Sequence, residues 1–422
     1  MNKHMKNAYI RILETELMPA MGCTEPIAIA YAGAVARKVL GNVPEKVLVR
    51  CSGNIIKNVK GVIVPSTKDM RGIETSALLG VLWGNPDDKL EVLKGITEEQ
   101  VATMVQYLEK GICSVELAAG VENLYIDMII SDGTHCAEVV ISQWHTNIVK
   151  VASDGQSILE SESESFHDFE EEEKIMDLKG IYDFAREGDI AELIPYIDRQ
   201  IQYNKAISEE GIKNQYGANV GKSILKHRHH EIREVAKAYA AAGSDARMAG
   251  CELPVVINSG SGNQGITVSV PVVKYAEYLG VSDEKLYRAL ILSNLVAIHI
   301  KRGIGKLSAF CGVVGAACGA GAGISFLYDD SFDVISNGVI NTLGNVSGIV
   351  CDGAKASCAA KIASALDASI MARELAIDGS RFQDGEGLVE ESAEETIENI
   401  WRLGKEGMKN TDTEILNMMI SN

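Results

Sequence analysis

The chain has 422 residues, more than one hydrophobic core usually organises, so about two domains are expected. Its formal net charge of −18 argues against nucleic acid as a partner, because phosphate binding needs a basic surface. The nine cysteines are an odd number and no apolar signal segment follows the first residues, so we expect reduced thiols and a cytoplasmic protein, not a secreted disulfide framework.

The first predicted elements are two helices separated by a short break. Apolar residues recur at helical spacing over residues 7–18, and a second helix is predicted over residues 26–40, where Pro26 suits the first turn. Cys23 lies just before this second helix. Free N–H groups and the helix dipole stabilise a thiolate at such a position.

Residues 43–160 change to short β-type runs, which predict an inserted α+β domain. Strands are predicted over residues 46–51, 59–64, 113–118, 124–131, 136–142 and 148–152. Helices are predicted over residues 69–82 and 98–110.

The acidic stretch 161–173 (SESESFHDFEEEE) is typical of a solvated domain linker. Beyond it the pattern is mainly helical, with a short strand predicted over residues 266–270 and helices over residues 222–242, 283–301, 308–327 and 351–377. Residues 308–327 carry no charge, but their bulk is alanine and glycine, so we expect a buried helix and no membrane span.

The predicted fold class is therefore α+β. A mainly α-helical catalytic domain would consist of residues 1–42 and 174–422, with residues 43–160 inserted as the α+β domain and residues 161–173 as the linker. The fold would then bring Cys23 back to the C-terminal half.

Two pairs of cysteines have the same spacing, since Cys318 follows Cys311 by seven positions and Cys358 follows Cys351 by seven positions. On one α-helix this spacing displaces the second thiol by about 10 Å along the axis, so at most one thiol of each pair would hold a small cluster. Cys311 and Cys351 are favoured, since both fall near predicted helix starts. The alternative for every thiol is a small buried apolar side chain.

With Cys23, these two cysteines form a candidate metal site. Three thiolates would leave one iron of a cubane without a protein ligand, as a Lewis-acid catalyst requires. The chain has no Cys-x-x-Cys motif, which argues against structural zinc and ferredoxin-type clusters.

Four motifs in this order resemble the L-cysteine desulfidases, which belong with the α-chain superfamily of iron–sulfur L-serine dehydratases. They are residues 21–26 (MGCTEP), 258–265 (NSGSGNQG), 310–323 (FCGVVGAACGAGAG) and 348–355 (GIVCDGAK). The resemblance implies a [4Fe–4S] cluster on Cys23, Cys311 and Cys351 and independence from pyridoxal phosphate. The Ser-Ser-Ser-His signature of the serine dehydratases is absent and the third cysteine is N-terminal, which favours cysteine as substrate.

Residues 258–265 are predicted to surround a small carboxylate with glycine N–H groups and polar side chains, although a flexible turn is the alternative. The chosen contacts are Ser259, Ser261, Asn263 and Gln264. Arg302 joins them as part of a cationic group with Lys301 and Lys306, which could instead be solvated residues at a helix end.

Lys57 and Lys306 are the candidate catalytic bases, provided that burial lowers the pKa of one of them. The predicted reaction converts L-cysteine and water to pyruvate, ammonia and hydrogen sulfide. The alternatives are an L-serine dehydratase with the same cluster and a non-catalytic redox- or iron-responsive binding protein. A small amino acid is the expected partner, and the sequence leaves open whether the chain forms a homo-oligomer.

Overall fold

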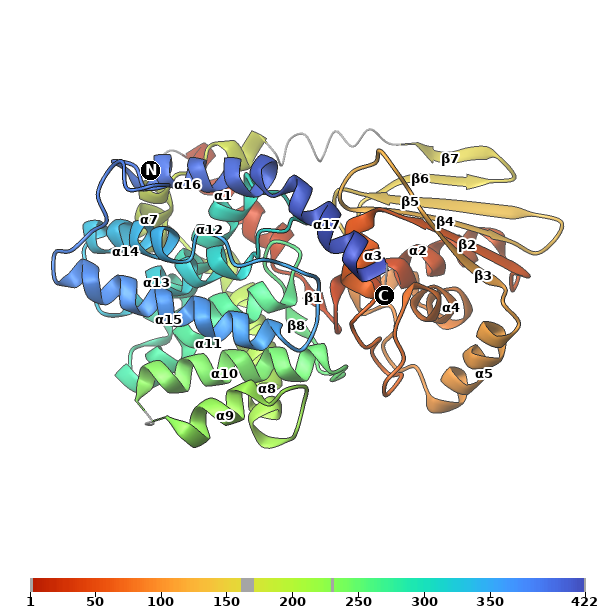
Figure 1. Cartoon of the computed structure of the whole chain (residues 1–422), viewed down its shortest axis with the longest axis horizontal. Helices are drawn as coiled ribbons and strands as arrows, with labels where there is room; N and C mark the ends of the chain where they lie inside the picture. Colours follow the sequence, from red (N-terminus) through yellow and green to blue (C-terminus); the bar gives the residue numbers. More distant parts are fainter. Residues whose placement is uncertain (1–2, 161–170, 229–230, 421–422) are drawn as a thin grey trace.

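The computed structural model describes residues 3–160, 171–228 and 231–420 (Figure 1). It has the α+β class predicted from the sequence, with a mostly helical body. Figure 1 shows the helical body on the left and a sheet with its covering helices on the right. Residues 161–170 of the predicted acidic linker lie outside the described residues, while residues 171–173 are helical.

One six-stranded sheet has the strand order β3-β2-β4-β5-β6-β7. All neighbouring strands are antiparallel except the parallel pair β2 and β3. The strands are β2 (Lys46–Cys51), β3 (Cys113–Leu117), β4 (Tyr125–Ser131), β5 (Cys136–Ser142), β6 (Ile148–Ser153) and β7 (Gln156–Glu160). Five of them match predicted strands. In β2 the alternating residues Val47, Val49 and Cys51 are buried, as the sequence pattern indicates.

Two features of the sheet half differ from the sequence prediction. The predicted strand 59–64 is wrong: Val59 ends helix α3 (Gly53–Val59), which begins where the Ser52 side chain accepts a hydrogen bond from Ile55 N, and a loop follows. Strand β7 was missed because every one of its residues is exposed, so no apolar alternation marks it.

The sheet is covered by helices α2 (Thr24–Leu40) and α4 (Ile73–Trp83). Helix α5 (Glu98–Glu109) packs on α4, and the short 3₁₀ segment η1 (Pro86–Glu91) packs on α2. Helix α2 packs against β4, β5 and α4. Its approach to α4 is close: a Cβ added at Gly80 would lie 2.1 Å from the carbonyl oxygen of Ala30. Of the N-terminal helices expected in the helical body, α1 (Lys3–Glu16) packs there and α2 covers the sheet.

The helical body is built around α12 (Asp283–Arg302) and α13 (Val313–Leu327), which pack along one another. Glycines of α13 allow this approach, since a Cβ at Gly319 would lie 2.2 Å from Ser293 O. The other elements of the body are α7 (Leu178–Glu187), η2 (Ala191–Leu193), α8 (Ile194–Lys213), α9 (Val220–His227), α10 (Ile232–Met248), α11 (Gly262–Leu279), α14 (Phe332–Asn345), α15 (Cys358–Ile377), α16 (Ala393–Arg402) and η3 (Leu403–Gly407).

Three predictions for this half are corrected. The single helix predicted over residues 222–242 is two helices, α9 and α10. The predicted strand 266–270 lies inside α11, whose residues 262–276 are buried on all sides, so its β-branched run has no polar face to reveal the helical period. Helix α15 begins at Cys358, seven residues later than predicted, because residues 351–357 are irregular.

The helix predicted over the uncharged segment 308–327 is α13, which is buried as expected but begins at Val313, five residues later than predicted, because residues 308–312 are irregular. Within the described ranges, no helix combines the length and the hydrophobicity that crossing a bilayer requires.

Two elements join the sheet half to the helical body. Strand β1 (Pro19–Ala20) pairs with β8 (Val255–Val256), and Ile257 N donates a hydrogen bond of 2.9 Å to Met18 O. Helix α17 (Lys409–Ile420) leaves the body and lies against α3 (Figure 1). The β1–β8 pair therefore places Cys23 next to the loop that leads into α11.

Candidate active site

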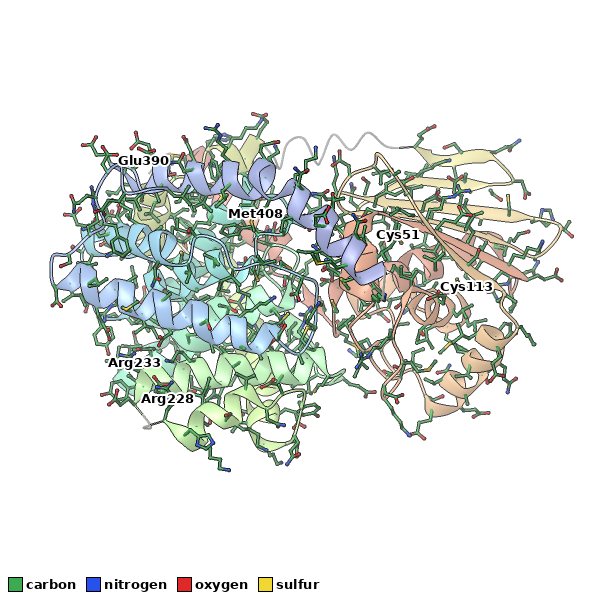
Figure 2. All side chains as sticks on the ribbon, in the orientation of Figure 1. Cys51, Cys113, Arg228, Arg233, Glu390 and Met408 are labelled. Carbon is green, nitrogen blue, oxygen red and sulfur yellow. The ribbon has the colours of Figure 1, made fainter. Side chains whose placement is uncertain are left out.

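Cys23, Cys311 and Cys351 line the same cavity, which has a volume of about 90 Å³. Cys23 comes from the segment before α2, Cys311 from the segment before α13, and Cys351 from the loop between α14 and α15. The fold thus brings together the three thiols selected from the sequence. Cys51 and Cys113, in contrast, lie on strands of the sheet (Figure 2).

A short antiparallel bridge holds Cys311 beside Cys351. Phe310 pairs with Val350, Cys311 N donates to Ile349 O at 2.9 Å, and Cys351 N donates to Ala309 O at 2.7 Å. The Cys311 thiol donates a hydrogen bond to the sulfur of Cys351, which raises the pKa of Cys311 and lowers that of Cys351. The cations of Lys57 and Lys301 lower the pKa of Cys351 further.

Cys23 is the N-cap residue of α2, and its thiol donates to Glu25 Oε2 at 2.8 Å. Burial and the Glu25 carboxylate raise the pKa of Cys23. Burial opposes ionisation of Glu25, yet the neighbouring ring of His145 and the hydrogen bond from Cys23 outweigh it and lower the pKa of Glu25 to about 2. Asn58 Nδ2 also donates to Glu25, at 3.2 Å.

The turn before Cys23 requires glycine. Gly22 has φ +56°, a conformation that residues with a side chain adopt at a cost, and a Cβ there would lie 2.3 Å from Pro65 Cγ. The position of Cys23 therefore depends on this tight approach between the two loops.

Cys358 also lines the cavity, whereas Cys318 does not. The spacing argument set both aside by assuming that each pair lies on one helix. That assumption fails for Cys358, because residues 351–357 are irregular and bring its thiol back to the cavity. Cys318 lies inside α13 and lines a separate small cavity with Thr342.

The start of α11 forms one wall of the cavity. Ser261, Asn263 and Gln264 line it. Asn263 Oδ1 and Gln264 Oε1 are buried and have no hydrogen-bond partner within the described part of the chain. Ser259 lies in a neighbouring pocket instead, where its hydroxyl donates to Asn258 Oδ1 at 2.9 Å.

Arg247, at the end of α10, is a cavity residue that the sequence analysis missed. Its side chain is among the largest that are fully buried, yet Nε and Nη2 have no hydrogen-bond partner in the described residues. The guanidinium packs directly on the α11 backbone, since a Cβ at Gly262 would lie 2.3 Å from Nε. A single arginine within the alanine-rich run 236–249 was the available signal.

The candidate lysines occupy different surroundings. Lys57 is buried next to the cavity, forms an ion pair with Asp412 and donates to Cys351 O at 3.4 Å. Lys306 lines the cavity, forms an ion pair with Glu16 and stands 3.5 Å from the centre of the Trp144 ring. Lys301 also lines the cavity and is buried, and this burial lowers its pKa to about 8.

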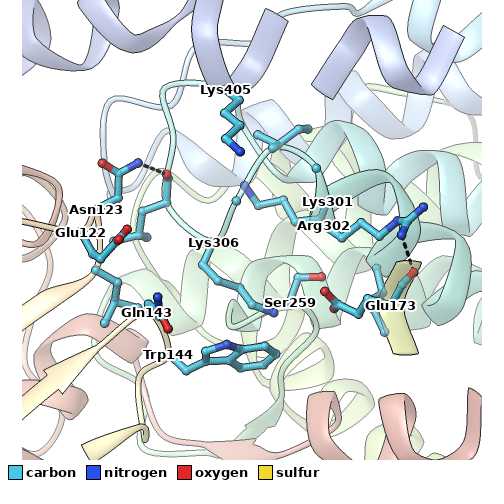
Figure 3. A pocket seen from close by; sticks show the side chains of 16 residues that line it. Glu122, Asn123, Gln143, Trp144, Glu173, Ser259, Lys301, Arg302, Lys306 and Lys405 are labelled. Atoms are coloured by element: carbon cyan, nitrogen blue, oxygen red, sulfur yellow. Dashed lines mark hydrogen bonds between the residues drawn. The ribbon is translucent and has the colours of Figure 1, made fainter. Parts of the chain in front are cut away.

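A wider pocket of about 300 Å³ adjoins the cavity (Figure 3). Lys301, Lys306 and Leu307 line both spaces, so the two spaces are neighbours. Arg302 lines only the wider pocket, and its guanidinium donates to the carbonyls of Glu173 and Met176. Arg302 therefore stands apart from the wall formed by α11.

The donor set of the cavity suits an iron–sulfur cluster better than a single ion. Among the described residues, no three His, Cys, Asp or Glu side chains are grouped closely enough to hold one metal ion. A cubane is larger and takes one thiolate for each iron, so its ligands stand farther apart. The cavity offers thiols from separate segments, with the cation of Arg247 to offset the charge of thiolates.

The fold and the cavity define a mainly helical α+β protein with thiols from separate segments lining one cavity. Residues 87–417 match the family model described as serine dehydratase alpha chain, and the chain belongs to that family. Membership indicates a dehydratase-like lyase. The matched segment contains Cys311 and Cys351, whereas Cys23 lies before it.

Relatives are similar along nearly the whole chain. A UPF0597 protein of Lachnoclostridium phytofermentans is 48% identical, over 99% of this chain and 100% of its own length. The UPF0597 proteins of Desulfitobacterium hafniense and Treponema denticola are 47% and 46% identical, over 98% and 99% of this chain and 96% and 98% of their own lengths.

Proposed function

We propose that the protein is an iron–sulfur L-cysteine desulfidase that converts L-cysteine and water to pyruvate, ammonia and hydrogen sulfide. The observation that carries the proposal is the convergence of Cys23, Cys311 and Cys351 on one cavity. Family membership supports lyase chemistry, and the N-terminal position of Cys23 favours cysteine over serine. The reaction would need no pyridoxal phosphate.

The three thiolates would hold a [4Fe–4S] cluster, which when bound supplies an iron without a protein ligand as a Lewis acid for the substrate sulfur. The Arg247 guanidinium would offset part of the negative charge of the thiolates. The wall formed by Ser261, Asn263 and Gln264 would orient the substrate in a cavity that has room for only a small molecule.

We assign the role of base to Lys301. Its neutral amine would take the α-proton of the substrate, the C–S bond would break with its electron pair leaving on sulfur, and the resulting aminoacrylate would react with water to give pyruvate and ammonia. Lys57 and Lys306 suit this role less well, because each is held in an ion pair, Lys57 with Asp412 and Lys306 with Glu16.

Protein purified without oxygen would test the proposal. We expect iron and acid-labile sulfide close to a four-iron stoichiometry and release of sulfide from L-cysteine. Pyruvate from L-serine without sulfide from L-cysteine would establish the serine dehydratase alternative. Absence of both iron and lyase activity would favour the non-catalytic binding protein.

The role of Lys301 has its own test. Lys301→Met should lower kcat by about 100-fold or more while the iron content stays that of the unaltered protein. Lys274→Met is the matched control, because Lys274 is also a buried lysine but pairs with Glu277 on α11, away from the cavity. Equal activity of the two variants would remove Lys301 as the base.

A further inference from the structure

The buried guanidinium of Arg247 forms no ion pair with any carboxylate in the described part of the chain. An arginine is never deprotonated in a protein, and a buried charge is costly unless it is paired and hydrogen-bonded. Nε and Nη2 nevertheless have no partner among the described residues, although the side chain lines the thiol cavity. An anion in the cavity would satisfy both N–H groups.

The N-terminus of α11 lies beside the Arg247 guanidinium. This helix has 18 residues and begins after Ser261, whose side chain caps none of its N–H groups. The first N–H groups of a helix have no partner inside it, and the helix dipole favours an anion there. Because Gly262 has no side chain, the guanidinium lies directly on this first turn.

Two acceptors stand on the same turn. The amide nitrogen of Asn263 donates to Met248 Sδ at 3.6 Å, which leaves Oδ1 without a partner among the described groups. Gln264 packs against Gly312, where a Cβ would lie 2.5 Å from its Cδ. Since Gly312 follows Cys311, this contact places the free Oε1 of Gln264 in the neighbourhood of a candidate cluster ligand.

We propose that Arg247 and the first turn of α11 bind the α-carboxylate of the substrate, and that Asn263 Oδ1 and Gln264 Oε1 accept hydrogen bonds from its α-ammonium. The planar guanidinium matches a carboxylate, and two amide oxygens match an ammonium. This site would select a free α-amino acid and reject its amide, its ester and a peptide. This inference rests on the proposed function and identifies Arg247 as the side chain that recognises the α-carboxylate of the substrate.

The first experiment uses the unaltered anaerobic protein and ligands that lack a thiol. Calorimetry should detect binding of L-alanine, while L-alaninamide and propionate, each without one of the two charges, should bind at least roughly 10-fold more weakly. Equal affinity for L-alanine and L-alaninamide would overturn the proposal, as would no binding of L-alanine.

The second experiment compares variants. Arg247→Met should raise the dissociation constant of L-alanine and the KM for L-cysteine by roughly 10- to 100-fold, with a smaller effect on kcat and an unchanged iron content. Arg247→Lys should restore part of the affinity. Arg199→Met is the control, because the Nε of Arg199 is also buried without a partner in the described chain but lies outside the cavity.

The outcomes separate this inference from the proposed function. A folded Arg247→Met protein that binds L-alanine like the unaltered protein would refute the carboxylate site and leave sulfide release untouched. Protein without iron or sulfide release that still needs Arg247 to bind L-alanine would refute the desulfidase proposal and retain the site. If Arg247→Met fails to fold, the comparison of L-alanine with L-alaninamide decides.

Discussion

The ammonium of Lys57 forms an ion pair with the carboxylate of Asp412, which joins α3 in the sheet half to the C-terminal helix α17. Asp412 Oδ2 also accepts a hydrogen bond of 2.9 Å from Ala309 N, two residues before Cys311. Lys57 in turn donates to the carbonyl of Cys351. Through these contacts the Lys57–Asp412 pair connects α3 and α17 with the two segments that carry Cys311 and Cys351.

Removing one partner of this pair should destabilise the protein strongly. Lys57→Met leaves the Asp412 carboxylate without its counter-charge, and we expect a loss of about 3–5 kcal/mol in the free energy of unfolding, measured by urea titration. The double variant Lys57→Met/Asp412→Leu should recover a large part of that loss, because neither charge then remains. Lys68→Met is the control, since its pair with Glu98 is solvent-exposed and should leave the midpoint unchanged.

Serine substitution of the cysteines should sort them by iron content. Cys23→Ser, Cys311→Ser and Cys351→Ser should each reduce the iron bound by anaerobic protein to a small fraction of the unaltered value. Cys318→Ser should retain the iron, because Cys318 lies in a separate cavity. Iron analysis and the visible absorption spectrum provide the measurement.

Cys358→Ser tests whether Cys358 is a fourth candidate ligand, since its thiol lines the same cavity as those of Cys23, Cys311 and Cys351. We expect Cys358→Ser to retain the iron. If it loses the iron while Cys23→Ser keeps it, the ligand set inferred from the sequence would have to be replaced by one that contains Cys358.

The sequence was informative where a local pattern matches a local structure. Strands β2 and β5 were predicted with their observed bounds because one face of the sheet is buried. Residues 266–270 were misassigned because a helix buried on every side has no polar face, and β-branched residues then indicate a strand. Cys358 was set aside because the spacing argument needed a helix where the chain is irregular.

Other features of the site depend on contacts between distant segments. Arg247 is buried without hydrogen-bond partners for Nε and Nη2 only because α10 packs on α11 in the folded chain. Lys57 and Lys306 were selected as bases without knowledge of Asp412 and Glu16, the carboxylates that pair with them in the folded chain. Such pairings leave no local trace in the sequence.

Gly22 should be far less replaceable than another glycine of the same backbone type. Gly22→Ala combines a strained φ with a collision against Pro65, so we expect a loss of about 3 kcal/mol or more and displacement of Cys23. Gly41→Ala, where φ is +80° but a Cβ meets nothing within 4 Å, should cost only about 1–2 kcal/mol. Urea unfolding and iron content would measure both effects, and similar losses in the two variants would contradict the importance of the Pro65 contact.

Asp245 should make the stability depend on pH. Burial raises the pKa of Asp245 to about 6, above the value of about 3.8 for an exposed aspartate, so the folded state binds the proton more tightly than the unfolded state. The stabilisation from this proton is complete below pH 4 and is lost as the pH rises through 6, with a size of about 1–3 kcal/mol.

The control for this pH effect is Asp245→Asn, which does not titrate at this position. Its free energy of unfolding, relative to the unaltered protein, should rise between pH 4 and 7. A difference that stays constant over this range would show that Asp245 does not titrate there.

Cys23 is attached to the sheet half through α2, whereas Cys311 and Cys351 belong to the helical body. A cluster bound by all three would cross-link the two halves of the molecule through three iron–thiolate bonds. Insertion of the cofactor would then be the last step of maturation. Oxidative loss of the cofactor would weaken the association of the sheet half with the helical body as well as abolish the reaction. Oxygen would thereby shorten the lifetime of the polypeptide itself, and sensitivity to proteases would report the state of the iron.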